Sequence, residues 1–180
     1  MKKKQLLQII VPVLLIAVIA GMWFIKNGEK ANDNLPTASL PTTMDGADFS
    51  LHATEQIDFA TLSEYGLPII VDYGSTSCQA CIEMAPVLEK INAAMQGKAF
   101  IKFVDVWKYF YAAANVPIQT IPAQVFFTKD GKAFVPSEAL KQQIDFRFEY
   151  DKSGNHLFTI HVGSLTEKQM RLILAEMGVM

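Results

Sequence analysis

Cysteine and histidine are scarce in this chain, which has 2 cysteines and 3 histidines among its 180 residues. A structural zinc site usually takes four cysteine or histidine ligands, and no second paired motif completes such a set. Basic residues are not in excess either, because 16 lysines and arginines stand against 18 aspartates and glutamates. These shortages argue against a metal-organised domain and, with no basic stripe in the body of the chain, against nucleic acid as the main partner.

Apolar residues, by contrast, make up 51% of the chain, and 12 of its residues are phenylalanines. This composition favours a hydrophobic core that contains a sheet over a disordered chain. The length corresponds to about one domain with an appendage.

The first 25 residues differ from the rest. Three lysines at positions 2–4 precede an uncharged, mostly apolar run over residues 6–25. Roughly 20 apolar residues are enough to cross a bilayer as a helix, and lysines before such a run favour an amino terminus on the inside. We therefore expect residues 1–25 to form a transmembrane signal anchor that places the rest of the chain on the extracytoplasmic side of the cell membrane. A cleaved signal peptide is the alternative, but its apolar region is usually only about 7–15 residues long.

A polar, proline-containing segment over residues 26–48 is typical of a flexible linker. From residue 49 to residue 180, apolar runs alternate with helical patterns, which predicts an α/β domain with a central sheet and helices on both faces. The expected elements are helices at 58–66, 78–95, 107–114 and 166–177, and strands at 67–73, 99–106, 123–128 and 157–162.

Both cysteines of the chain lie in one Cys-x-x-Cys motif, Cys78 and Cys81, directly after the strand predicted at 67–73. A disulfide between them would close too short a loop to stabilise the fold. A Cu(I) ion on two thiolates is chemically allowed and stays open. Because the motif begins a helix, for which Ser77 is the expected N-cap, the helix dipole favours a thiolate at Cys78. A redox pair, with Cys78 as the exposed nucleophile and Cys81 as the resolving thiol, explains the motif best.

Over nearly all of residues 49–180 the sequence resembles the thioredoxin superfamily. The resemblance is carried by VDYGSTSCQAC at 71–81, a proline five residues after Cys81, TIP at 120–122 ahead of QVFF, the KDGK turn, and VGSLTEKQM at 162–170. It implies a thioredoxin fold with thiol–disulfide oxidoreductase activity and no cofactor.

The resemblance also implies roles for particular residues. Cys78 and Cys81 match the attacking and resolving cysteines, and Asp72 matches a buried acid under them. A carboxyl in an apolar strand should have a raised pKa, which suits proton exchange with Cys81.

Four further positions match the family's substrate groove and frame. Pro122 matches a cis-proline that faces the cysteines, and the backbone of Ile121 would pair with an extended substrate segment. Gly163 matches a glycine that lines the same groove, and Pro86 matches a structural proline in the motif helix.

The expected anchor makes the chain look like membrane-bound, extracytoplasmic thioredoxin-like proteins. That resemblance implies exchange of disulfides with protein partners, as a reductant that a CcdA/DsbD-type membrane electron carrier resupplies. A Cu(I)-handling protein and a redox-inert adaptor with the same fold remain the alternatives.

Three departures from the family pattern stand out. Ser77 replaces the tryptophan that usually precedes the first cysteine. Phe103 stands where thioredoxins often have a lysine near the buried acid, while Lys102 should face the other side of the sheet. An insertion near residues 133–156 contains a helical turn and an added strand, which we interpret as a tolerated surface insertion in preference to a partner-docking edge.

Overall fold

The computed structural model describes residues 46–179. The anchor predicted over residues 1–25 lies outside the described residues, and so does the predicted linker apart from residues 46–48. Within residues 46–179, no helix is long and apolar enough to cross a membrane.

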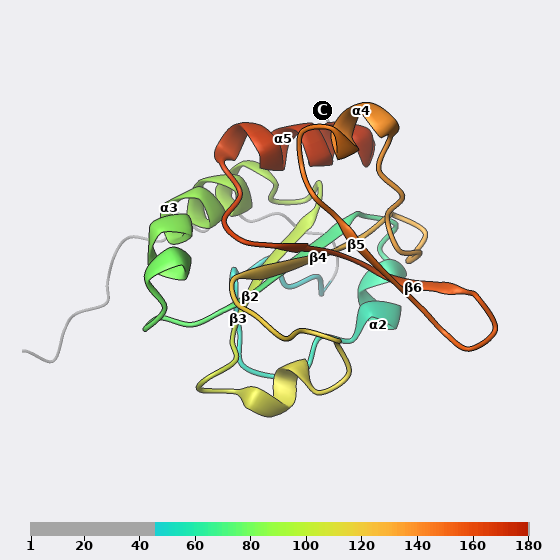
Figure 1. Ribbon diagram of the computed structural model, residues 1–180. Helices are drawn as coiled ribbons and strands as arrows, with labels where there is room; N and C mark the ends of the chain where they lie inside the picture. The colour runs from blue at the N-terminus through green and yellow to red at the C-terminus, as the bar shows by residue number, and fades with distance from the viewer. Residues whose placement is uncertain (1–45, 180) are drawn as a thin grey trace, which may run out of the picture. The chain divides into compact units, whose positions relative to one another are not determined.

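A mixed, six-stranded sheet forms the centre of the described domain, with strand order β1-β3-β2-β4-β6-β5 (Figure 1). The first three strands in this order are parallel, and β4, β6 and β5 are joined to them by antiparallel pairing. The strands are β1 (His52–Ala53), β2 (Ile69–Gly74), β3 (Phe100–Asp105), β4 (Ala123–Phe127), β5 (Arg147–Tyr150) and β6 (His156–Val162).

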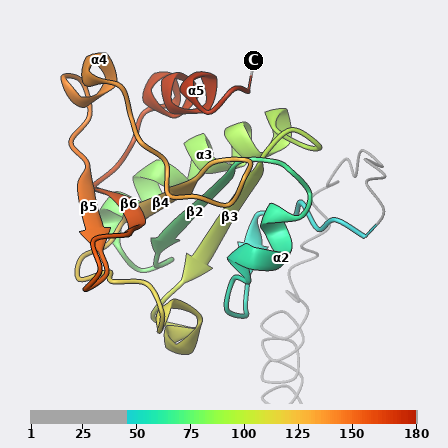
Figure 2. The ribbon, with the colours of Figure 1, turned by 90° about the vertical axis from the view of Figure 1, so that its right-hand side faces the viewer.

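Helices cover both faces of this sheet, as the sequence predicts. Helices α3 (Gln79–Ala94), α4 (Glu138–Lys141) and α5 (Glu167–Glu176) lie on one face, while α2 (Phe59–Ser63) and the short 3-10 helix η1 (Phe110–Ala113) lie on the other (Figures 1 and 2). Asp58 and Thr166 are the first residues of the ranges predicted as helices at 58–66 and 166–177. They cap α2 and α5, because their side chains accept hydrogen bonds from the first turns of these helices.

Strand β2 divides the core into two layers because its side chains alternate between the faces. Ile70 packs into the layer under α3 and α5, whereas Ile69, Val71 and Tyr73 pack into the layer under α2 and η1. All four side chains are fully buried. The carboxyl of Asp72, between Val71 and Tyr73, therefore points into the layer under α3.

The insertion near residues 133–156 does more than extend the surface. It supplies α4 and the edge strand β5, and its side chains Phe134, Leu140 and Ile144 are buried in the core layer under α3 and α5. The Ser137 hydroxyl at the start of α4 also donates a hydrogen bond to Glu176 of α5. These contacts make the inserted segment a packed part of the fold.

The segment after β3 differs from the helix predicted at 107–114. Only residues 110–113 are helical, in a single 3-10 turn. Trp107 and Phe110 keep 64% and 77% of their surface exposed, so these aromatic side chains do not provide the core contacts that a longer helix would need.

Candidate active site

The cysteine motif lies where β2 ends and α3 begins. Cys78 has an extended backbone (φ −96°, ψ 122°) and is the N-cap of α3, so the prediction of Ser77 as the cap is wrong. The Cys78 Sγ accepts a hydrogen bond from the Cys81 N–H at 3.4 Å. Ser77 instead donates its N–H to the Ser75 hydroxyl at 3.2 Å, one residue outside the helix. The helix amino terminus is thus aimed at the Cys78 sulfur.

The two thiols differ in exposure, and both are free. Cys78 is half-buried, whereas Cys81 retains only 3% of its surface. Burial, followed by the neighbouring Cys78 sulfur, raises the pKa of Cys81 to about 12. At neutral pH Cys81 is therefore a thiol, and it needs a nearby proton acceptor before it can attack a disulfide.

Asp105 at the end of β3 holds the loop that leads to Cys78. Its Oδ2 accepts hydrogen bonds from the Thr76 N–H and hydroxyl at 3.1 and 2.8 Å, and its Oδ1 accepts from the N–H groups of Trp107 and Lys108. Burial pushes the pKa of Asp105 upward, but these hydrogen bonds outweigh it and lower the pKa. Asp105 is not among the site residues predicted from the sequence, although an acid that ends an apolar strand is a signal for such a role.

Asp72 is fully buried beneath the motif. Its Oδ1 accepts a hydrogen bond from the Gln124 side chain at 2.6 Å, and its Oδ2 has no partner among residues 46–179. Burial raises the pKa of Asp72 to about 7, and the bond from Gln124 opposes that rise.

No cation balances this carboxyl in the described chain. Phe103 is the direct neighbour of Asp72 on β3. Lys102 lies on the opposite face of the sheet, where its ammonium donates to Asp48 at 3.0 Å and to the Ser50 carbonyl at 2.8 Å. The expectation that Lys102 points away from Asp72 is confirmed.

Gly74 keeps open the space between Asp72 and Cys81. A Cβ at this position would lie 3.3 Å from both the Asp72 Oδ2 and the Cys81 Sγ, and 2.9 Å from Cε2 of Phe103. The carboxyl and the thiol therefore face the same small space. Because the Asp72 Oδ2 has no hydrogen-bond partner among residues 46–179, a proton would pass between them through a water molecule.

The predicted groove residues lie beside the motif. The Ile121–Pro122 peptide bond is cis. The Gly163 N–H donates to the Pro122 carbonyl at 2.9 Å, and the neighbouring Ser164 hydroxyl donates to the Ala80 carbonyl at 3.0 Å. Gly163 has a φ of 117°, which favours glycine. Two hydrogen bonds thus connect the cis-proline loop, the loop between β6 and α5, and the motif.

Pro86 lies in the middle of α3 on its exposed side. It has no N–H to donate to the preceding turn, yet the helix continues through it to Ala94. It lies five residues after Cys81, a little over one turn further along α3.

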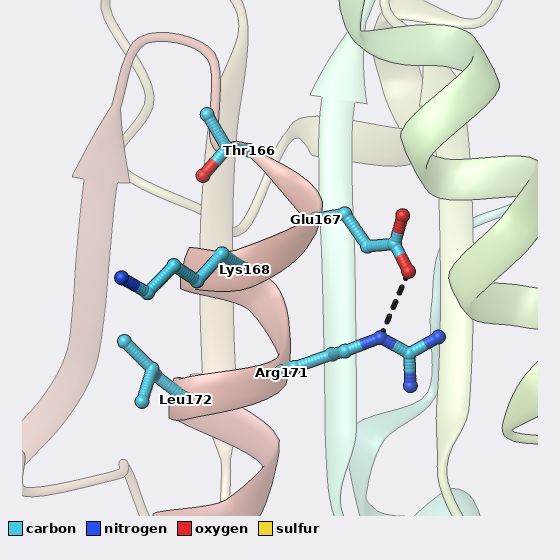
Figure 3. Close-up of a pocket in the computed structure, with 5 residues that line it drawn as sticks. All are labelled: Thr166, Glu167, Lys168, Arg171 and Leu172. Atoms are coloured by element: carbon cyan, nitrogen blue, oxygen red, sulfur yellow. Dashed lines mark hydrogen bonds and ion pairs between the residues drawn. The ribbon is translucent and has the colours of Figure 1, made fainter.

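Surface hollows do not by themselves mark this site. A hollow of about 590 Å³ lies over α5 and contains neither cysteine. Figure 3 shows residues that line it, among them Arg171, whose guanidinium pairs with Glu167 at 2.9 Å. A smaller cavity of about 140 Å³ touches Cys81, Leu88 and Phe103. Within the described range, no cluster of three or more histidine, cysteine or acidic side chains is arranged to hold a metal ion.

Fold and site together define a thioredoxin-like redox domain, and the sequence comparisons with known proteins agree. The sequence model of the Thioredoxin family matches residues 52–146. Thioredoxins of Staphylococcus aureus strains Mu50 and MW2 are each 36% identical over 94 residues, which is 49% of this chain and 88% of the relative. The solved thioredoxin of Fasciola hepatica has 22% identity and a TM-score of 0.48, and the match covers 70% of this chain and 97% of that one.

The chain belongs to the thioredoxin family, an assignment that rests on the sequence matches. Its similarity to curated thioredoxins supports thiol–disulfide oxidoreductase activity. The cysteine pair that such activity requires is present as Cys78 and Cys81.

Proposed function

We propose that this protein is an extracytoplasmic reductant of protein disulfides. The observation that carries the proposal is the division between an accessible Cys78 at the start of α3 and a buried Cys81 that faces the carboxyl of Asp72. The extracytoplasmic location is supported by the lysine-headed apolar run at residues 2–25 and by the polar segment that follows it.

The first step is attack by the Cys78 thiolate on a partner disulfide. One partner sulfur forms a bond to Cys78, and the other leaves as a thiolate. The amino terminus of α3 stabilises negative charge at Cys78 while the attack takes place.

The second step releases the partner. The proton of the Cys81 thiol passes to the Asp72 carboxylate, and the Cys81 sulfur attacks Cys78. The bond between Cys78 and the partner breaks, the Cys78–Cys81 disulfide forms, and the partner leaves with both of its sulfurs reduced. A carboxyl with a pKa of about 7 suits this exchange, because it accepts and returns a proton near neutral pH.

The groove provides a place for the partner chain. An extended segment would lie along the backbone of Ile121 next to Gly163, as the family resemblance implies. For regeneration, a CcdA/DsbD-type membrane electron carrier would reduce the Cys78–Cys81 disulfide by the reverse exchange.

Trapping of partners tests the proposal. In the full chain, Cys81→Ala should accumulate a mixed disulfide through Cys78, since the resolving thiol is absent, and Cys78→Ala should not. Separately, the parent should reduce a disulfide-linked peptide, and Cys78→Ser should lose that activity by at least about 1000-fold. A parent without reductase activity, or equal trapping by both alanine variants, would contradict the proposal.

A Cu(I)-handling role is the second candidate, because two thiols three residues apart can bind this ion. Stoichiometric Cu(I) uptake by a parent that reduces no disulfide would favour it. A redox-inert adaptor would instead keep its cellular function in the double variant Cys78→Ser, Cys81→Ser.

A further inference from the structure

The side-chain amide of Gln124 is fully buried at the centre of the site, and it takes no part in the two steps of disulfide exchange. Gln124 is the second residue of β4, and it pairs directly with Asp72 on β2 and with His161 on β6. It is the one polar residue of the strand AQVFF. A buried amide needs hydrogen bonds to offset its loss of water, so its partners indicate why it is there.

The Gln124 amide nitrogen joins two functional elements. It donates to the Asp72 Oδ1 at 2.6 Å and to the Gly163 carbonyl at 3.1 Å, and it also touches the Met84 sulfur at 3.4 Å. The Asp72 Oδ1 and the Gly163 carbonyl oxygen are both acceptors, so the group between them must be the NH₂ of Gln124. Turning the side-chain amide over would place its oxygen against both acceptors. The Gln124 Oε1 has no partner among the described residues.

We propose that Gln124 is a positioning residue that fixes the orientation of the Asp72 carboxyl and ties it to the partner groove at Gly163. Since Oδ1 is held by the amide, the proton from Cys81 goes to Oδ2, the oxygen that faces the space above Gly74. This inference rests on the proposed function, in which Asp72 accepts that proton.

The same amide couples the groove to the acid. A hydrogen bond to an ionised carboxylate is stronger than one to a neutral carboxyl. The hydrogen bond from the Gln124 amide to Asp72 is therefore strongest when Asp72 is ionised. A partner segment that shifts the Gly163 carbonyl changes the other contact of the same NH₂ group.

Replacing Gln124 with methionine tests the inference, because it keeps nearly the same volume and removes both donors. The carboxyl of Asp72 in the reduced full chain is followed by ¹³C NMR as pH is varied. Losing a charge-assisted hydrogen bond should move its midpoint upward by about one pH unit. The pH profile of partner release should move in the same direction by a similar amount.

Met84→Leu is the matched control. It alters packing around Gln124 and removes the contact with sulfur, but it leaves the donors to Asp72 and Gly163 in place. Its titration midpoint for Asp72 should stay within about 0.3 pH units of the parent, which is well below the shift expected from a lost charge-assisted bond.

Other titratable groups near the amide are followed in the same spectra. Cys81 of α3 faces Asp72, and Cys78 is the other cysteine of the motif, three residues before Cys81. His161 lies beside Gln124 on β6, and the neighbouring β3 residue, Phe103, carries no charge. Separate signals for the His161 ring and the two cysteine Cβ carbons assign each transition to its own group.

An unchanged Asp72 midpoint in Gln124→Met, or equal shifts in Gln124→Met and Met84→Leu, would overturn the inference. Should the methionine variant fail to fold, the parent protein still tests the inference. Because the Gln124 amide donates to Asp72, its side-chain N–H signals should shift with pH at the same midpoint as the Asp72 carboxyl. N–H signals that do not respond to pH would overturn it as well. These spectra need no partner, so they distinguish failure of this inference from failure of the proposed reductase activity.

Discussion

Asp72 and Lys102 are both buried charged residues on neighbouring strands, one residue out of register, yet their surroundings are opposite. Lys102 meets Asp48 and the Ser50 carbonyl on one face of the sheet. Asp72 meets only an amide on the other face. Burial alone would raise the pKa of Asp48, but hydrogen bonds from Ser50 and Lys102 together have the larger effect, so this pKa is lowered. At Asp72 burial has the larger effect, so the pKa is raised. On one face of the sheet, the buried charge of Lys102 is thus balanced by the Asp48 carboxylate. On the other face, the Asp72 carboxyl has no cation beside it among the described residues and is available for proton transfer.

The largest effect is expected for Asp72→Asn. Because the folded pKa of Asp72 is raised from 3.8 to about 7, the folded state binds the proton more tightly than the unfolded state. The contribution of Asp72 to stability is fully present below pH 4, and it is lost as pH rises to about 7. The asparagine variant should therefore be more stable than the parent at pH 9, by up to about 4 kcal/mol, and nearly equal to it at pH 4.

Urea unfolding of the two proteins at both pH values measures this difference. The same variant should release trapped partners more slowly at neutral pH, because Cys81 loses its proton acceptor. A stability gain that does not depend on pH would contradict a raised pKa at Asp72.

Phe103→Lys gives the second largest effect by placing a cation on the Asp72 side of the sheet. An ammonium within reach of the carboxylate should lower the Asp72 midpoint by about one to two pH units. Phe103→Met is the uncharged control, which should leave the midpoint near that of the parent. Carboxyl NMR on both variants separates the effect of charge from that of packing. Equal midpoints in the two variants would show that residue 103 does not face the acid.

Lys102→Met should have the smallest effect, a loss of about 1 kcal/mol, since the Asp48 side chain is 70% exposed and water can replace the lysine. The depressed pKa of Asp48 makes its share of this stability present above the unfolded pKa and lost as pH falls through the folded one. The cost of Lys102→Met should therefore shrink below pH 4, as urea unfolding would show. A changed Asp72 titration in this variant would contradict the placement of Lys102 on the far face.

Sequence patterns were sufficient to predict the frame of this fold. The apolar run at 67–73 predicts a central strand, and the helices predicted from 58 and from 166 begin where expected, because these signals are local. The short 3-10 turn after β3 was not predictable in this way. Its aromatic residues have the composition of a packed helix, and only the tertiary structure shows that Trp107 and Phe110 are exposed.

The sequence predicts which residues form the site better than it predicts the contacts that they make. Cys78 and Cys81 are apparent from their motif, and Asp72 is indicated by the resemblance to thioredoxins. Ser77 was wrongly expected as the cap because serine is the commoner capping residue. The role of Gln124 depends on strand register between segments 52 residues apart, which no local pattern specifies. A single amide in an apolar strand was the one signal available.

Titration of the Asp72 carboxyl in the reduced full chain, followed by ¹³C NMR, tests the central claim most directly. A buried acid that takes the proton of Cys81 should titrate with a midpoint near 7. A midpoint near 4, the ordinary value for an aspartate, would show that Asp72 is charged throughout the neutral range and is not the proton acceptor.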